Sequence, residues 1–361
     1  MPEVVDEAED LQATFERLAR GGASKFAGAL VPIGSPVESS DHRTVCRVHL
    51  IQTDANGNVR ARELAKRIFD RVVPFCIPRS RIRQAKEISA EDDDWGPLGA
   101  LQREAKNLFV NQMKTGEPGE LLLFLLQEYV LKIPQIVAKM PLKTSTSMHI
   151  HGSDGLHAKL LPDGLLALYW GESKLHKTLN GALKDAFESL EEYLNDSNED
   201  KTNRDLEIIR DNLDVDDEEL TKRLYLYFAG ETEESAKVEY RAACLVGFDV
   251  VDYPEIKAGE TEVSEDLQKI IDSWTKTLNN RITSANFQKF SIELFMIPFE
   301  SVFDFRVEFL KHCGVDTEKA IEILKERDEK KRLAKEAKAK QQPDMDGEAE
   351  GSEWDARPSD D

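Results

Sequence analysis

The sequence has little cysteine and no long apolar segment. Its longest apolar run, residues 121–126, is far shorter than the roughly 18 residues that indicate a membrane span. The N-terminus, MPEVVDEAED, is acidic where a signal peptide would be basic and then apolar, so we expect a cytoplasmic protein that contacts no membrane. No CxxC pair occurs among the four cysteines, which argues against a zinc ribbon or a disulfide framework and favours buried, reduced thiols. They are Cys46, Cys76, Cys244 and Cys313.

An excess of basic residues is also missing, because the formal net charge is −21. This charge argues against strong affinity for free nucleic acid, since duplex binding draws most of its affinity from Lys and Arg on phosphates. The charge is uneven: residues 196–219 hold eleven acidic against three basic residues, and residues 341–361 hold eight against one. Between residues 99 and 180, nine basic residues oppose seven acidic ones. We therefore look for the chemistry in that segment.

The chain is long enough for a large core, with 361 residues of which 40% are hydrophobic. We expect an α/β fold in which a mixed sheet is flanked by helices. Composition and periodicity divide the chain into five predicted parts. These are an acidic, mostly helical leader (1–25), a small N-terminal α/β lobe (26–97), a core (98–310), a charged C-terminal helix (311–342) and a disordered acidic tail (343–361).

Hydrophobic periodicity predicts the order helix, three strands, helix, strand in the core. Pro134 is expected to dent the helix predicted over 119–139. The predicted helices cover 61–73, 98–114, 119–139, 178–195 and 317–342. The predicted strands cover 43–53, 144–150, 154–161, 165–174, 223–230, 240–250 and 290–299.

A hairpin turn is expected at Pro162-Asp163-Gly164, between two apolar runs. Counted from Asp163, Asp154 lies nine residues before the turn and Glu172 nine after it. The two carboxylates should therefore face each other, with Cβ atoms roughly 5 Å apart, where unpaired like charges repel. A cation is expected between them.

Strand periodicity puts Glu172 and Lys174 on one face with Leu168 and Trp170. Carboxylate oxygens that leave positions for water and phosphate suit Mg²⁺ or Mn²⁺ better than zinc. Such a metal can polarise a phosphodiester, and a nearby lysine can position water or offset developing charge. The pattern is typical of a metal-dependent nuclease.

These residues resemble the PD-(D/E)xK nuclease superfamily: Asp154, then Glu172-Ser173-Lys174 after an apolar strand. Glu120 is similar to the acid that many members carry on the first core helix. The segments GSDGLHA, YWGESKLH and GELLLFLLQEYVL more closely resemble the HamA family, the nuclease effectors of the bacterial Hachiman anti-phage system, over about residues 26–310. One departure is that Gly152-Ser153 precede Asp154 where the motif's name has Pro.

The resemblance implies a restriction-endonuclease-like fold and a DNA endonuclease with catalytic residues Glu120, Asp154, Glu172 and Lys174. The three carboxylates would bind Mg²⁺ or Mn²⁺. It also implies a superfamily 2 helicase partner, similar to HamB, in a 1:1 heterodimer that keeps the nuclease quiet until abnormal DNA engages the helicase. The acidic segments fit this scheme because they would repel free duplex.

Several alternatives stay open from the residues alone. His149 and His151, with His157 nearby, could mark a zinc hydrolase, and the core could be a noncatalytic helicase- or DNA-binding subunit. Glu128 is a weaker substitute for Glu120, and His176 could contact substrate or be structural. The helix over 317–342 could be a solvated face held by i, i+4 charge pairs or a surface that docks a partner.

Overall fold

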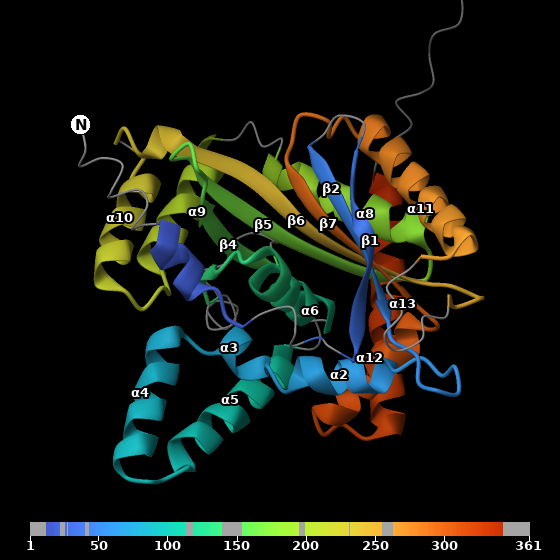
Figure 1. Cartoon of the computed structure of the whole chain (residues 1–361), viewed down its shortest axis with the longest axis horizontal. Helices are drawn as coiled ribbons and strands as arrows, with labels where there is room; N and C mark the ends of the chain where they lie inside the picture. The colour runs from blue at the N-terminus through green and yellow to red at the C-terminus, as the bar shows by residue number, and fades with distance from the viewer. Residues whose placement is uncertain are drawn as a thin grey trace, which may run out of the picture.

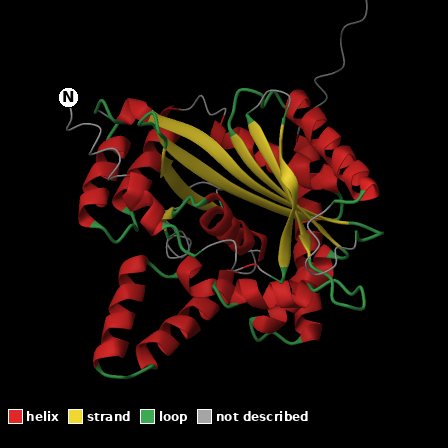
Figure 2. Cartoon of the chain, viewed as in Figure 1, coloured by secondary structure: helices red, strands yellow, loops and turns green. Residues whose placement is uncertain are grey.

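A single mixed sheet of seven strands organises the computed structural model, and helices lie on both sides of it (Figure 2). The structure describes residues 12–21, 26, 28–39, 43–112, 118–138, 154–194, 199–230, 232–254 and 263–341. The spatial order of the strands is β1-β2-β7-β6-β5-β4-β3. Their bounds are β1 (Leu30–Glu38), β2 (Thr44–Ile51), β3 (Gln135–Val137), β4 (Gly155–Leu160), β5 (Leu166–His176), β6 (Val238–Asp249) and β7 (Ile292–Phe299).

The middle of the sheet is parallel and its margins are antiparallel. β2, β7, β6 and β5 run in one direction, whereas β1 pairs antiparallel with β2, and β4 pairs antiparallel with β5 and β3. The predicted mixed α/β sheet is thus confirmed, and it is compatible with a nuclease-like fold. β1 and β2, from the segment expected to form an N-terminal lobe, extend the core sheet through the pairing of β2 with β7.

Helices follow most of the strands, and residues 12–18 are also helical. In Figure 1, α4 and α5 reach away from the sheet as a pair, while α9 and α10 lie near one end of it. The bounds are α2 (Ala61–Phe69), α3 (Val72–Cys76), α4 (Arg79–Glu91), α5 (Gly96–Gln112), α6 (Pro118–Leu126), α8 (Leu179–Leu194), α9 (Glu199–Asp211), α10 (Glu218–Phe228), α11 (Glu265–Ser284), α12 (Val302–His312) and α13 (Thr317–Gln341).

The two faces of the sheet pack against different helices. On one face, α2, α3, α6 and α12 bury their apolar side chains against β5, β6 and β7 in one continuous core. On the other face, α8 and α11 cover the alternate residues of β6 and β7, and α9 and α10 cover those of β4 and β5. Because both faces are covered, β5 reads as an almost unbroken apolar run until Glu172.

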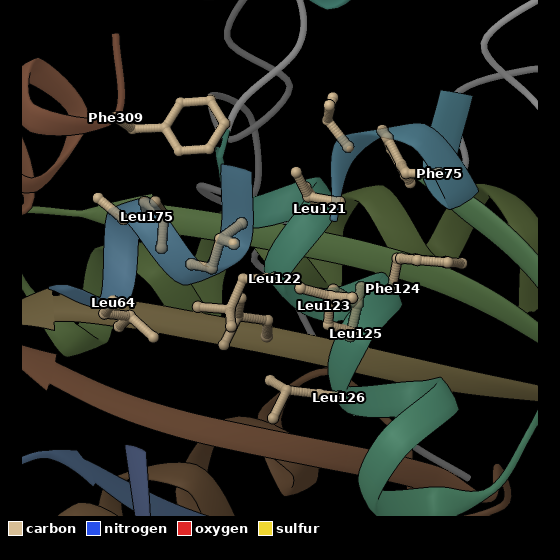
Figure 3. Packing of buried hydrophobic residues seen from close by; sticks show 14 of the residues in the cluster. Leu64, Phe75, Leu121, Leu122, Leu123, Phe124, Leu125, Leu126, Leu175 and Phe309 are labelled. Atoms are coloured by element: carbon tan, nitrogen blue, oxygen red, sulfur yellow. The ribbon is translucent and has the colours of Figure 1, made fainter. Parts of the chain in front are cut away.

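Helix α6 is buried along its whole length, as its sequence PGELLLFLL predicts. Pro118 starts the helix, a position where its missing N–H costs nothing. The leucines point in several directions, toward Leu64 of α2, Phe75 of α3, Phe309 of α12 and Leu175 of β5 (Figure 3). This packing fixes the start of α6 relative to the end of β5.

The predicted helix over 119–139 is too long. The helix continues from α6 as a π-helical segment, Gln127–Leu131, and ends at Lys132, which has a φ of 58°. Pro134 has no N–H and disfavours helical backbone at the residue before it, so the chain turns into β3. β3 supplies a strand between the first core helix and β4; the segment 144–150, where we expected one, lies outside the described residues.

The predicted strand over 223–230 is wrong, because these residues belong mostly to α10. The alternating sequence LYLYF resembles a strand, but the buried face starts earlier, at Leu220, and continues through Leu224 and Phe228. Asp217 caps the helix by accepting the Leu220 N–H at 2.8 Å. The predicted helix over 61–73 is divided in two, because α2 ends at Phe69 and α3 starts at Val72. The remaining predicted elements in the described residues are confirmed to within a few residues of their bounds.

The absences noted in the sequence have structural counterparts. All four cysteines are buried and none forms a disulfide. In the described part of the chain, no helix is long and apolar enough to cross a membrane.

Candidate active site

The β4–β5 hairpin has the predicted register. Leu160 pairs with Leu166, and Gly155 pairs with Gly171, so the hairpin is centred on Asp163. Gly164 has a φ of 83°, which explains the glycine after the turn aspartate. Continued by one step, this register sets Asp154 against Glu172.

Asp154 lies immediately before β4 and is held by Ser173. Its carboxylate Oδ2 accepts the backbone N–H of Ser173 at 2.7 Å and the Ser173 hydroxyl at 2.8 Å. Its own N–H donates to the Gly171 carbonyl at 2.7 Å. At the end of the β4–β5 ladder, the Asp154 side chain therefore accepts the Ser173 N–H of β5 in the place of a backbone carbonyl. Two donors on one oxygen fix the orientation of this carboxylate.

Glu172 is a buried carboxylate in the middle of the sheet. Its residue is 2% exposed, and its Oε1 contacts the ammonium of Lys174, two residues further on the same face. Leu168 and Trp170 pack in one apolar cluster and Tyr169 in another, which confirms the predicted alternation along β5. The cation compensates for a charge that would otherwise be costly to bury.

The pKa of a neighbouring thiol, that of Cys244, is affected by Asp154, Glu172 and Lys174 together. Cys244 of β6 pairs with Glu172 of β5. The pKa of its thiol is raised, first by burial and then by the Glu172 charge; Asp154 raises it further, whereas Lys174 lowers it. Asp154, Glu172 and Lys174 therefore act electrostatically on the same point of the sheet.

Glu120 lies in the first turn of α6 and is buried at 6% exposure. The helix approaches β5 closely here: a Cβ on Gly119 would lie 3.2 Å from the Ser173 hydroxyl oxygen and 3.1 Å from Leu175. Helix α6 covers the face of β5 opposite to Glu172, but its start lies against Ser173, the residue that holds Asp154. A role for Glu120 as a metal ligand stays a prediction.

The residues fit a hard divalent cation as a pair of oxygen ligands. Among the described residues, no group of three or more His, Cys, Asp or Glu side chains is arranged to hold a metal ion. Asp154 and Glu172 instead offer two carboxylates, and in Asp154 both bonds from Ser173 go to Oδ2 and not to Oδ1. Mg²⁺ commonly binds through one or two carboxylates and completes its octahedron with water and phosphate oxygens.

Other sequence candidates have structural roles or lie elsewhere. His149 and His151 lie outside the described residues. His157 is fully buried, its Nδ1 lies 2.9 Å from the Ile133 carbonyl, and burial lowers its pKa to about 3. Glu128 is buried between two arginines, Arg20 and Arg79, and accepts the Gln135 N–H at 2.9 Å. It holds the core together and does not replace Glu120.

Two further residues position the end of β5: Arg306, which no sequence pattern indicated, and His176, for which a structural role was one of the two expectations. Arg306 of α12, itself buried, donates to the carbonyl of Leu175 at 2.8 Å and so holds the residue after Lys174. His176 accepts the Thr178 N–H at 3.2 Å and packs closely over Gly181 of α8. Ser173, which orients Asp154, was visible only as the middle residue of the ExK triplet.

The fold and this cluster define an α/β protein with a paired-carboxylate and lysine site on a mixed sheet. A family model for HamA matches residues 33–313, most of the chain. The chain belongs to the HamA family, and this membership suggests a component of Hachiman defence. No curated protein and no solved structure matches it.

Proposed function

We propose that the protein is a metal-dependent DNA endonuclease, the effector of an anti-phage defence system, and that it works with a helicase similar to HamB. The observation that carries this proposal is the cluster formed by Asp154, Glu172 and Lys174, in which a buried carboxylate contacts an ammonium beside a second, oriented carboxylate. A structural ion pair alone would not need the second carboxylate. Family membership supports the same activity.

Each residue has a chemical role in this proposal. Asp154 and Glu172 would hold Mg²⁺ or Mn²⁺, and the bound metal would polarise the phosphodiester and lower the pKa of a water. Ser173 keeps Asp154 in its orientation through the two hydrogen bonds to Oδ2. Lys174 would offset the charge that develops on the phosphate, since its ammonium is partly exposed and lies next to Glu172.

The negative net charge of the chain supports the proposal that a partner brings DNA to the site. At −21, the overall charge of the protein weakens its affinity for DNA, and a helicase in a 1:1 complex would deliver the strand to the site. The acidic tail, residues 343–361, is expected to add to this repulsion.

Plasmid degradation with Mg²⁺, with and without the cognate helicase and ATP, tests the proposal. We expect the wild type to cut, and Lys174→Ala and Glu172→Gln to lose cutting while they keep folding and helicase binding. Lys159→Ala is the matched control, because Lys159 lies on the same hairpin at its other end. Full cleavage by Lys174→Ala would refute the proposed chemistry. No cleavage by the wild type with helicase and ATP would favour a noncatalytic subunit.

A further inference from the structure

A pocket opens at the carboxyl ends of β5 and β6, beside the candidate active site. It has a volume of about 570 Å³, within the range of ligand pockets. The end of β5 and the loop after it form one wall, and the start of α12 with the middle of α13 forms the other. Ligands in sheets with parallel strands commonly bind outside the carboxyl ends of those strands.

More cationic than acidic side chains line the pocket, whereas the chain as a whole is acidic. Three acidic side chains line it, Asp185, Asp249 and Asp328. Six cationic side chains line it: Lys174, Lys177, Arg306, Arg327, Lys331 and Arg332. Glu172 offsets part of the charge of Lys174. Glu329 and Glu336 offset part of the charge of Arg332. In a chain of net charge −21, a concave site where cations outnumber the lining acids still favours anions over its acidic surroundings. We call it the basic pocket.

The basic pocket adjoins the candidate active site through Lys174. Lys174 contributes to both, because its ammonium contacts Glu172 and its side chain also lines the pocket. Arg306 lines the pocket while it donates to the Leu175 carbonyl at 2.8 Å. An anion in the pocket would therefore lie next to the end of the ExK segment. Phosphates of a DNA strand follow one another at a spacing of a few ångströms, so one strand can occupy both places.

One carboxylate, that of Asp249, already lies in the pocket and is held by the start of α12. Asp249 Oδ1 accepts the N–H of Val302, in the first turn of α12, at 2.7 Å. The pKa of Asp249 is raised, first by burial and also by the Asp304 charge, while the Val302 N–H, Lys177 and Arg306 lower it in part. Lys177 and Arg306 therefore act on a negative charge placed in the basic pocket, although they do not outweigh its burial.

Helix α13 brings cationic side chains from beyond the part of the chain that matches the family. The match ends at residue 313, whereas α13 starts at Thr317 and contributes Arg327, Lys331 and Arg332 to the pocket. Ala320 and Leu324 are buried and anchor this helix against α12, so it is not solvated on all sides. Arg332 also pairs with exposed glutamates, Glu329 and Glu336, as the sequence predicted for this helix. The side of α13 that lines the basic pocket can also contact a ligand.

We propose that the basic pocket binds a backbone phosphate of the DNA strand next to the phosphodiester held at Asp154 and Glu172, which makes α13 part of the substrate-binding surface. This inference rests on the proposed nuclease function and names how its substrate is held. Lys331 is the best position to test it, because it lines the pocket yet is exposed, so its replacement leaves the core intact.

The test is DNA binding by the full-length protein in EDTA, where no cleavage occurs. The probes are a fluorescent 20-base-pair duplex and the single strand of the same length, titrated at several salt concentrations. Each phosphate contact contributes about 0.9 to the slope of log K against log salt concentration for a duplex. We expect Lys331→Ala to reduce that slope by about 0.9 and to weaken binding at low salt. Lys325→Ala removes the same charge from an exposed position of α13 outside the pocket and should leave the slope unchanged.

The outcomes separate this inference from the proposed function. Equal slopes for Lys331→Ala and Lys325→Ala would overturn it, and so would a wild type that binds neither probe at low salt. If cleavage with Mg²⁺ is normal but the slopes are equal, the pocket assignment alone fails. If the slope changes as expected but neither the wild type nor any variant cleaves DNA, the nuclease proposal alone fails. Lys177→Ala, on the opposite wall, gives a second exposed position at which the same slope change is expected.

Discussion

The hydroxyl of Ser173 offers a way to disturb Asp154 without touching a charged group. Ser173→Ala removes the donor at 2.8 Å from Asp154 Oδ2 and keeps the backbone N–H at 2.7 Å. The carboxylate then has one fixed donor where it had two. No buried donor is left without a partner by this change, so we expect the protein to fold.

The size of the effect follows from these two bonds. A hydrogen bond to a charged group contributes about 1.5–3 kcal/mol. Asp154 is partly exposed, so water replaces some of the lost bond, and we expect a decrease of about 1 kcal/mol in the free energy of unfolding. Loss of a residue that orients a metal ligand typically weakens metal binding about 10–100-fold. Because one donor remains, we expect the lower end, about tenfold.

The assay is DNA cleavage over a range of Mg²⁺ concentrations, with urea unfolding as the measure of stability. We expect Ser173→Ala to need about tenfold more Mg²⁺ for half-maximal cleavage, with a smaller change in rate at saturating Mg²⁺. Ser235→Ala is the control, since Ser235 donates its hydroxyl to the Thr232 carbonyl at 2.6 Å near the opposite end of β6. An unchanged Mg²⁺ requirement in Ser173→Ala would refute the idea that Ser173 orients a metal ligand.

Three further predictions concern the fold that supports the site. Glu128→Ala leaves two partly buried arginines, Arg20 and Arg79, without this buried carboxylate and should lower the free energy of unfolding by about 3–5 kcal/mol in urea. The exposed control Glu322→Ala should change it by no more than about 0.5 kcal/mol, and equal effects would contradict this prediction. Gly247→Ala places a Cβ 2.4 Å from Leu175 Cδ2, so thermal melting should show a loss of about 1–3 kcal/mol, and an unchanged melting temperature would show that β5 and β6 tolerate the methyl. Burial lowers the pKa of His49 to about 4 and of His157 to about 3, so the unfolded chain takes up protons before the folded protein does as the pH falls below about 6.5. The free energy of unfolding should therefore be constant with respect to these two groups above that pH and lower by about 4 kcal/mol at pH 5. A flat profile of unfolding free energy from pH 7 to 5 would contradict both assignments.

The parts of the fold that could be predicted from sequence are those set by short-range patterns. The Pro162-Asp163-Gly164 turn fixed the register of β4 on β5, and the spacing of apolar residues predicted α8 almost to its ends. The strand predicted over 223–230 is wrong because LYLYF resembles a strand, whereas the buried set of α10 begins earlier, at Leu220, and Asp217 caps the helix. Local periodicity cannot choose between a helix and a strand when a segment matches both.

The residues of the candidate active site also divide into those that local sequence patterns predict and those that they do not. The shared face of Glu172 and Lys174 followed from strand parity, and the approach of Asp154 followed from the turn. The contact of Arg306 with Leu175 joins residues 131 positions apart, and no local pattern contains it. The basic pocket depends on how α13 packs on α12, which charge alternation along α13 does not reveal. Contacts set by tertiary packing appear only when the elements are assembled.

The central claim is that Asp154 and Glu172 bind one divalent cation together. Crystals of the protein soaked in Mn²⁺ would test it through the anomalous signal of the metal. We predict one peak about 2 Å from a carboxylate oxygen of each residue, with Lys174 alongside. A peak bound by only one of the two carboxylates, or no peak near either at saturating Mn²⁺, would contradict the account.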